Sequence, residues 1–345
     1  MPIVQHDILR TLASDILHAA GVPEDDARII GDHLVNANLL GHDSHGVWQI
    51  QGYVQELADG YVGWDEREVV RESPVLQIFD AHGGNGIVTL TRATDIVVEK
   101  ARQSTIGMVG LRDVTHMGRL GDYPPRIAEQ GMIGMVWTNT GGLSVAPFGG
   151  VDRKLRLAPV SYAVPRRDGP PLMLDMTLSV VAGGKIIQKM VHGEQLPEGW
   201  LIDREGNYVT DPAGWRTPDV AILPLGGLQF GHKGHGMAMM MEMIVGPLTL
   251  AGCTDGVGGG GGALLTAINI EAFTDLDTYH NQVEEYLEWV RSSATIPGFS
   301  GVYAPGELEE ANRTRHLKDG IDVPDPTWAD LAEVAAGLSV AMPAI

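Results

Sequence analysis

The sequence contains a single cysteine, Cys253, and no long uninterrupted hydrophobic segment. One cysteine cannot form an internal disulfide, so nothing indicates an oxidising compartment. The longest apolar stretch, residues 237–251, is shorter than a membrane span and is interrupted by Glu242. The first residues lack a basic segment followed by an apolar run, which argues against a secretory signal. We therefore expect a cytoplasmic protein.

Basic residues are scarce. The chain has 24 lysines and arginines against 44 aspartates and glutamates, which gives a formal net charge of -20. Such a field repels nucleic acids and anionic membrane surfaces, so we expect neither as a partner. A site for an anionic ligand must therefore be built from specific cations or helix amino termini, which makes each lysine or arginine near a predicted turn informative.

The usual nucleotide and catalytic fingerprints are also missing. No GxGxxG motif follows a predicted strand, and GxxxxGK[ST] does not occur. HExxH, CxxC and GxSxG are absent as well. These absences argue against a standard Rossmann domain, a P-loop, a zincin, a dithiol redox centre and an α/β-hydrolase.

What is present is the composition of a globular protein, with 44% hydrophobic and 20% charged residues. The first third of the chain has apolar residues at helical spacing. Short apolar runs then alternate with helical patterns, which predicts an α/β fold with a sheet covered by helices on both sides. The expected strands are VLQIF, IGMVGL, MIGMVWT, SYAVP, LMLDM, AILPL and LLTAINI, and the main expected helices cover residues 122–130, 177–191 and 233–251.

These patterns suggest a division of the chain into two parts. We expect a helical region at residues 1–72, packed with a carboxy-terminal segment at 264–345, and a central α/β domain at 73–263. The glycine-rich run at residues 255–262 is typical of a surface loop.

Two histidines lie in glycine-flanked polar clusters at predicted element ends. Ser44 and His45 stand in DSHG between two helices, where a small glycine leaves an imidazole accessible for proton transfer. The alternative is a helix cap. His116 stands in THMGRLGDY after the strand IGMVGL, at the kind of sheet edge where open α/β folds bind ligands. The alternative there is a surface histidine in a strand-to-helix turn.

Three further clusters are candidates for ligand binding. Lys233 is bracketed by glycines at a predicted helix start, which suits an anion; its neighbours His232 and His235 give only a weak metal signal. Asp175 ends the strand LMLDM and could orient a histidine, bind a ribose or cap a helix. The tripeptide PGE at residues 305–307 is otherwise a common turn. The methionines at 237, 239, 240, 241 and 243 are expected to fill the core.

In their order and spacing, these segments resemble the malate/L-lactate dehydrogenase family of the non-Rossmann type, whose members include ureidoglycolate dehydrogenase, diketogulonate reductase, sulfolactate dehydrogenase and piperideine-2-carboxylate reductase. The resemblance covers nearly the whole chain. It is carried by LLGHDSHGVWQIQGYV, FDAHGGNG, THMGRLGDY, EQGMIGMVWTNT, LMLDMTLS, GEQLPEGWLIDREGNYVTDP, LPLGGLQFGHKGHGMAMMMEM and IPGFSGVYAPGE.

The resemblance implies a mixed sheet of about seven strands, a homodimer and NAD- or NADP-dependent interconversion of a 2-hydroxy acid and its 2-oxo form, or of a related imine. It implies that His45 is the proton donor and acceptor, with Ser44 as its polar partner, and that His116 is a second catalytic imidazole. Histidine suits this task because its pKa lies near neutrality. The implied cofactor contacts are Thr140, Asp175, Met176, Thr177, Lys233, Pro305, Gly306 and Glu307.

Departures from the family pattern fall on the substrate side. Gln49 stands where the family commonly has an arginine that binds the substrate carboxylate. Arg156, Leu157 and Ala158 replace a Gly-Thr-Asn pattern, and Gly183 with Gly184 replaces an Arg-Gly pair. Gln49, Tyr53, Arg119 and Arg156 are therefore the substrate-side candidates. Either Arg119 or Arg156 supplies the missing cation, or the substrate carries an uncharged polar group at that end.

Two other classes of function remain open on sequence alone. One is a metal-dependent hydrolase built on His42, His45, His232 and His235, although we assign no metal ligands. The other is a non-catalytic binding protein derived from the dehydrogenase.

Overall fold

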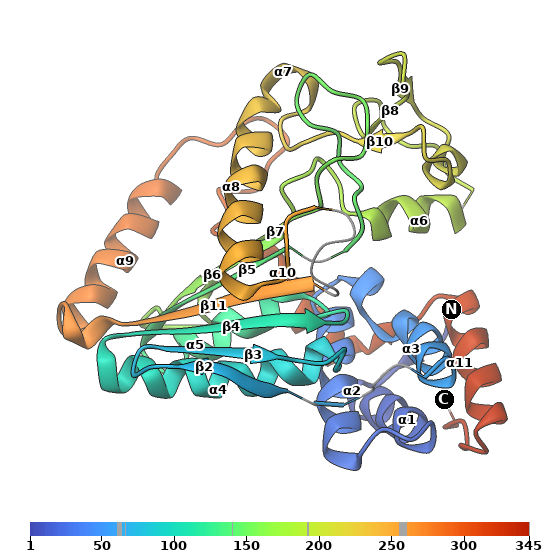
Figure 1. The fold of residues 1–345 in the computed structure, drawn as a ribbon, viewed down its shortest axis with the longest axis horizontal. Helices are drawn as coiled ribbons and strands as arrows, with labels where there is room; N and C mark the ends of the chain where they lie inside the picture. The colour runs from blue at the N-terminus through green and yellow to red at the C-terminus, as the bar shows by residue number, and fades with distance from the viewer. Residues whose placement is uncertain (61–63, 66, 140, 192, 255–260, 345) are drawn as a thin grey trace.

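The centre of the molecule is a seven-stranded mixed sheet (Figure 1). The computed structural model describes residues 1–344 except 61–63, 66, 140, 192 and 255–260. The strand order is β2-β3-β4-β11-β5-β6-β7, and within it only β3 and β4 pair in parallel. The predicted fold class, a non-Rossmann mixed sheet of about seven strands with helical cover, is confirmed. The strands are β2 (Glu68–Glu72), β3 (Leu76–Asp80), β4 (Ile106–Val114), β5 (Met132–Thr138), β6 (Val160–Val164), β7 (Leu172–Met176) and β11 (Gly261–Asn269).

Helices cover both faces of this sheet (Figure 1). On one face α4 (Gly86–Ser104) and α5 (Tyr123–Ala128) share a core with β4 and β11 that includes Leu111 and Leu265. On the other face α8 (His232–Thr249) packs Met241 against Leu264 of β11. Successive residues of β11 thus enter opposite cores, as the pleat of a strand covered on both sides requires.

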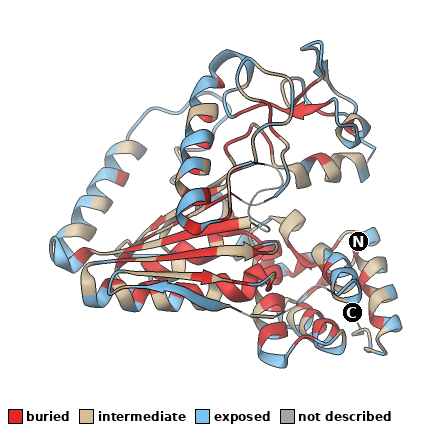
Figure 2. Ribbon diagram, viewed as in Figure 1, coloured by how far each residue is buried: buried red, intermediate tan, exposed pale blue. Residues whose placement is uncertain are grey.

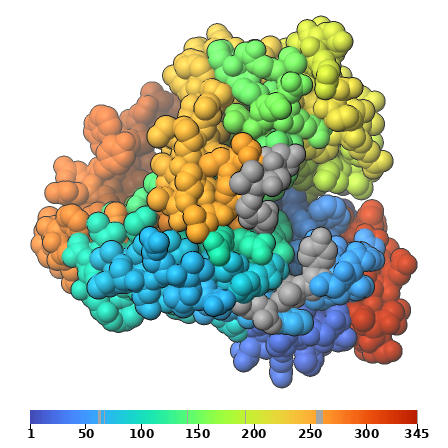
Figure 3. All heavy atoms as spheres, viewed as in Figure 1, coloured from blue at the N-terminus to red at the C-terminus, as the bar shows by residue number. Residues whose placement is uncertain are grey.

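The amino-terminal helices form a separate cluster with the end of the chain. It comprises α1 (His6–Ala19), α2 (Glu24–Leu39), α3 (Ile50–Ala58) and α11 (Asp325–Gly337), and β1 (Ile3–Val4) pairs with β12 (Ile321–Asp322). Figure 2 shows buried residues on the inner faces of these helices, and Figure 3 shows the end of the chain against its beginning. The boundaries differ from the expected division, because β2 is an edge strand of the main sheet and β11, with residues 264–269, is its central strand. Residues 255–260 of the predicted loop lie outside the described residues.

A third group of elements stands on the α8 side of the sheet (Figure 1). AILPL contributes only β10 (Ala221–Ile222) to a small sheet with β8 (Leu201–Ile202) and β9 (Tyr208–Val209), rather than a strand of the main sheet. The helix expected at 177–191 begins only at α6 (Gly183–Val191), because Ser179 is bridged to Pro224 in extended backbone. The remaining elements here are α7 (Gly227–Phe230) and the 3-10 helix η4 (Pro212–Arg216).

The expectation that the methionine stripe of α8 fills the core is wrong for most of its members. Met241 is buried, whereas Met240 and Met243 are 53% and 50% exposed. The outer face of α8 is therefore an exposed apolar surface. Beyond β11 follow the 3-10 helix η5 (Ile270–Ala272), α9 (Leu276–Arg291) and α10 (Glu307–Asp319), and α9 exposes Tyr286 and Trp289. Among the helices that the structure describes, none is long and apolar enough to cross a membrane.

Candidate active site

The first catalytic candidate lies in the 3-10 turn η1 (Asp43–His45), which is followed by the 3-10 turn η2 (Val47–Gln49). Asn38 of α2 donates from its amide nitrogen to Oδ1 of Asp43 at 2.7 Å. A Cβ on Gly46 would lie 2.2 Å from Oδ1 of Asn38, so only glycine fits against this amide. Neither Asp43 nor Ser44 caps a helix with its side chain, so the capping alternative is not what the structure shows.

Ser44 and Gln49 hold His45 in place. Oγ of Ser44 lies 3.1 Å from Nδ1 of His45. Nε2 of Gln49 donates to the carbonyl oxygen of Ser44 at 2.7 Å. The amide nitrogen of Gln49, a substrate-side candidate from the sequence, is thus committed to the backbone of the turn that carries His45. Gly184, at the start of α6, approaches so closely that a Cβ there would lie 2.8 Å from Cβ of Ser44.

The second catalytic candidate, His116, lies beside the first. The imidazole rings of His45 and His116 are nearly parallel, with centroids 5.8 Å apart and 23° between their planes. Oη of Tyr53 lies 2.6 Å from Nδ1 of His116. Each imidazole is therefore held through Nδ1 by a hydroxyl group, and among the described residues no hydrogen bond engages either Nε2. This arrangement leaves both Nε2 atoms for proton exchange with a ligand.

Both imidazoles stay neutral near pH 7, although His45 is only partly buried and His116 is exposed at the surface of the site. Desolvation, followed by the neighbouring His116, lowers the pKa of His45 to about 3. Desolvation, followed by the field of His33, lowers the pKa of His116 to about 4. Desolvation also raises the pKa of Tyr53, so its phenol stays protonated. The pair therefore presents unprotonated bases, and an anionic ligand bound beside them would raise the pKa of each towards neutrality.

We expect the variant Tyr53→Phe to lower turnover about fivefold to tenfold, because it removes one hydrogen bond worth about 1 kcal/mol that orients His116. The affinity for cofactor should not change. Steady-state kinetics and a fluorescence titration measure the two quantities, with the exposed Tyr208→Phe as the matched control. Normal turnover of Tyr53→Phe would show that Tyr53 does not orient the imidazole.

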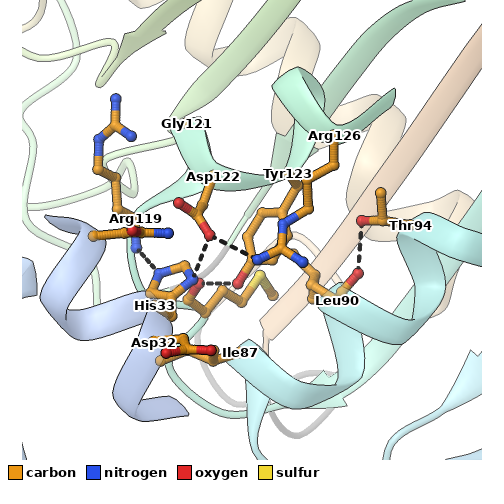
Figure 4. A network of polar contacts seen from close by, with 12 residues as sticks. Asp32, His33, Ile87, Leu90, Thr94, Arg119, Gly121, Asp122, Tyr123 and Arg126 are labelled. Carbon is orange, nitrogen blue, oxygen red and sulfur yellow. Dashed lines mark hydrogen bonds and ion pairs between the residues drawn. The ribbon is translucent and has the colours of Figure 1, made fainter. Parts of the chain in front are cut away.

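The loop that carries His116 is fixed by a buried network that the sequence did not reveal (Figure 4). Nε2 of His33, on α2, accepts a hydrogen bond from the backbone N–H of Arg119 at 2.8 Å. Nδ1 of His33 lies 3.3 Å from Oδ2 of Asp122, which also pairs with Arg126 at 3.3 Å. A Cβ on Gly118, where φ is +63°, would lie 2.1 Å from His33. The network thus positions the loop between His116 and the 3-10 turn η3 (Leu120–Asp122).

The same loop brings Arg119 to Asp175 at the end of β7. Nε of Arg119 lies 3.6 Å from Oδ2 of Asp175, and both side chains are largely buried. The backbone N–H of Gly121 donates to the same Oδ2 at 2.8 Å. Burial raises the pKa of Asp175, while Arg119 opposes the shift. Asp175 is therefore the ion-pair partner of Arg119, and its contact with a ribose stays a prediction.

The residues of the PGE tripeptide also lie beside β7. The backbone N–H of Met173 donates to the carbonyl oxygen of Pro305 at 3.2 Å. Gly306, with φ of +91°, precedes α10, and Glu307 accepts from the N–H of Ala304 and pairs with Arg291. A cavity of about 360 Å³ opens here, large enough for part of a nucleotide. Its lining includes Arg166, Leu172, Tyr303, Pro305, Gly306, Glu307 and Thr314.

The remaining predicted site residues contact other parts of the protein. Met176 ends β7, and the hydroxyl of Thr177 accepts from Ser179 at 3.1 Å. Arg156 bonds Glu242 of α8 at 3.2 Å and also donates to the carbonyl oxygen of Gly141. Lys233 is exposed in the first turn of α8, with Nζ 5.7 Å from the ring centre of Phe230. Thr140 lies outside the described residues.

Among the described residues, no ligand set matches the metal alternative. Within the described part of the chain, no group of three or more His, Cys, Asp or Glu residues is arranged to hold a metal ion. His42 instead lies 3.6 Å from Glu309, and the ring of His232 packs edge-on against Phe148.

The sequence and the fold are both similar to those of known proteins. A family model described as malate/L-lactate dehydrogenase matches residues 4–332. The malate dehydrogenase of Pyrococcus horikoshii is 35% identical over 351 residues, covering 98% of this chain and 96% of that protein. The L-sulfolactate dehydrogenase of Methanocaldococcus jannaschii is 32% identical over 342 residues, covering 96% of each. The crystal structure of malate dehydrogenase from Entamoeba histolytica matches with a TM-score of 0.94 and 26% identity, covering 99% of both chains.

The fold and the relatives thus define a dehydrogenase, an enzyme of the oxidoreductase class. The chain belongs to the malate/L-lactate dehydrogenase family, whose reaction is the oxidoreduction of 2-hydroxy acids. The resemblance drawn from the sequence motifs is confirmed.

Proposed function

We propose that the protein interconverts a 2-hydroxy acid and its 2-oxo acid with NAD or NADP, and that His45 and His116 exchange the hydroxyl proton. The observation that carries this proposal is the pair of neighbouring, neutral imidazoles, each held through Nδ1 by a hydroxyl group. Support for the reaction class comes from the named activities of the relatives.

In the oxidation direction, the C2–H bond and the O–H bond of the hydroxy acid both break. The nicotinamide, when bound, accepts the hydride. An unprotonated Nε2 of the histidine pair takes the proton, and the lowered pKa values keep that atom free near pH 7. In the reduction direction the same Nε2 returns a proton to the new alkoxide. Ser44 and Tyr53 orient the two rings through Nδ1.

The residues beside β7 fit a nicotinamide dinucleotide. The cavity next to Gly306 has room for part of a nucleotide, and its lining includes the hydroxyl groups of Tyr303 and Thr314. The guanidinium of Arg166 also lines it and is paired with Glu284. The groups that would hold it are Asp175, Met176, Thr177, Pro305, Gly306 and Glu307. We include Thr140 in this set on the family resemblance alone.

The cofactor assignment predicts that Lys233→Ala weakens binding of the reduced nicotinamide. If the ammonium group makes a charge-assisted hydrogen bond to a phosphate, its removal should cost roughly 1.5–3 kcal/mol of binding free energy. Fluorescence titration with NADH and NADPH measures the effect, with the exposed Lys318→Ala as control. Unchanged affinity for both cofactors would remove Lys233 from the site.

We also propose that the protein forms a homodimer. Support comes from the exposed apolar side chains on α8 and α9, including Met240, Met243 and Trp289, which are 53%, 50% and 71% exposed. The molar mass in solution tests this proposal.

A screen of purified protein against 2-oxo acids, non-acid ketones and cyclic imines tests the function. Each substrate is offered with NADH and with NADPH, and the absorbance of the reduced cofactor is followed. We expect oxidation of at least one cofactor with a 2-oxo acid. Activity on non-acid ketones alone would contradict the proposal.

A further inference from the structure

Arg119 carries buried hydrogen-bond donors that lack good acceptors among the described residues. Only 3% of the surface of Arg119 is exposed to solvent. Nε lies 3.6 Å from Asp175 and has no hydrogen-bond partner among the described residues. In the part of the chain that the structure describes, Nη2 donates only to the thioether sulfur of Met173, at 3.6 Å, and a thioether is a weak acceptor. Because unmet donors of a buried guanidinium are costly, this group is suited to an oxygen-rich anion.

The guanidinium of Arg119 is held by contacts with three neighbouring groups, Asp175, Met173 and Gly121. The backbone N–H of Arg119 is bonded to His33, and the side chain extends from that network towards Gly121 (Figure 4). A Cβ on Gly121 would lie 2.6 Å from Nη2 of Arg119, so only glycine leaves room for the group. Asp175 faces Nε, so the edge formed by the two Nη atoms meets no oxygen acceptor among the described residues.

Arg119 is also close to the reacting groups. It follows His116 by three residues, and its positive charge contributes to the lowered pKa of His45, after the larger effects of desolvation and the neighbouring histidines. The other arginine considered from the sequence, Arg156, is already engaged by Glu242 and by a backbone carbonyl. Gln49, at the position of the usual family arginine, is bonded to the carbonyl of Ser44.

We propose that Arg119 binds the carboxylate of the substrate through its Nη edge and thereby selects acids over neutral carbonyl compounds. This inference rests on the proposed function and names the group that sets its substrate class. The planar guanidinium matches a carboxylate with two parallel hydrogen bonds, which an ammonium group cannot reproduce. The arrangement replaces the cation absent at position 49 with one from a different loop.

The test compares Arg119→Lys, which keeps the charge opposite Asp175 but loses the fork, with the surface variant Arg102→Lys. Oxamate is the probe, because it joins a carboxylate to a carbonyl that resists reduction. Its binding is measured by calorimetry with and without NADH or NADPH. We expect Arg119→Lys to weaken oxamate binding at least about tenfold while its nicotinamide affinity stays normal. The control Arg102→Lys should bind oxamate and nicotinamide as the unmodified protein does. Unchanged oxamate affinity, or a tenfold loss of nicotinamide affinity in its place, would overturn the proposal.

Substrate preference of the unmodified protein gives a second test that needs no folded variant. We expect kcat/KM for pyruvate to exceed that for neutral methyl pyruvate by at least about tenfold; equal values would overturn the role of Arg119. The two proposals fail separately. If Arg119→Lys turns over 2-oxo acids with a normal KM, the role of Arg119 is rejected and the proposed reaction stands. If oxamate binding depends on Arg119 but no nicotinamide is oxidised, the anion site stands and the proposed reaction is rejected.

Discussion

Replacing either His45 or His116 with alanine should lower turnover by about a hundredfold to ten-thousandfold, because positioned proton transfer typically supplies that factor. Both imidazoles are oriented through Nδ1 and neutral near pH 7, so each variant removes a base that is ready to accept the hydroxyl proton. Single-turnover kinetics of cofactor oxidation measure the loss in the chemical step.

The control for these variants is His82→Asn. His82 is an exposed histidine with a φ of +49°, a conformation that asparagine tolerates. It should retain normal turnover, and all three variants should bind nicotinamide with normal affinity. If His45→Ala or His116→Ala keeps near-normal turnover, that histidine is structural and the other moves the proton alone.

The stability of the protein should fall as the pH is lowered from 6.5 towards 4, and His116 should account for part of the loss. Desolvation, with a smaller effect of His33, lowers the pKa of His116 from 6.5 to about 4 in the folded protein. In this interval the unfolded chain binds a proton at His116 that the folded chain does not. The free energy of unfolding therefore decreases with falling pH, and the contribution of this residue levels off below the folded-state pKa.

The variant His116→Gln should lose less stability than the unmodified protein across that interval. Denaturant unfolding at several pH values between 6.5 and 4 measures the difference, and His82→Asn again serves as the control. Parallel stability curves for His116→Gln and the unmodified protein would show that His116 takes up its proton equally in both states.

The fold could be predicted from the sequence where burial left a clear pattern. β4, β5 and β11 are covered on both faces, so their sequences are continuous apolar runs. β2 was missed because all of its residues are exposed at the sheet edge, and a segment such as EVVRE carries little hydrophobic signal. AILPL has the same apolar texture as the central strands, and only the long-range pairing places it in the small sheet.

The sequence predicts those residues of the candidate site that stand in short, recognisable motifs. Ser44, His45 and His116 stand in glycine-flanked polar clusters, a pattern that indicates a site. His33 was missed because a histidine among the apolar residues of α2 looks like part of the core, although a buried histidine needs hydrogen-bond partners. The sequence could not show which of Arg119 and Arg156 is free to bind a substrate. Their ion-pair partners, Asp175 and Glu242, are distant in sequence from the arginine that each contacts.

The most direct test of the central claim follows the hydrogen on C2 of the substrate. A 2-hydroxy acid carrying deuterium at C2, chosen as the product of the most active 2-oxo acid in the screen, is oxidised by the protein with NAD or NADP. Nuclear magnetic resonance of the reduced cofactor should show the deuterium on its nicotinamide ring, and His45→Ala and His116→Ala should transfer it far more slowly. Release of the deuterium to water, or the absence of any nicotinamide reduction with every 2-hydroxy acid tried, would contradict the account.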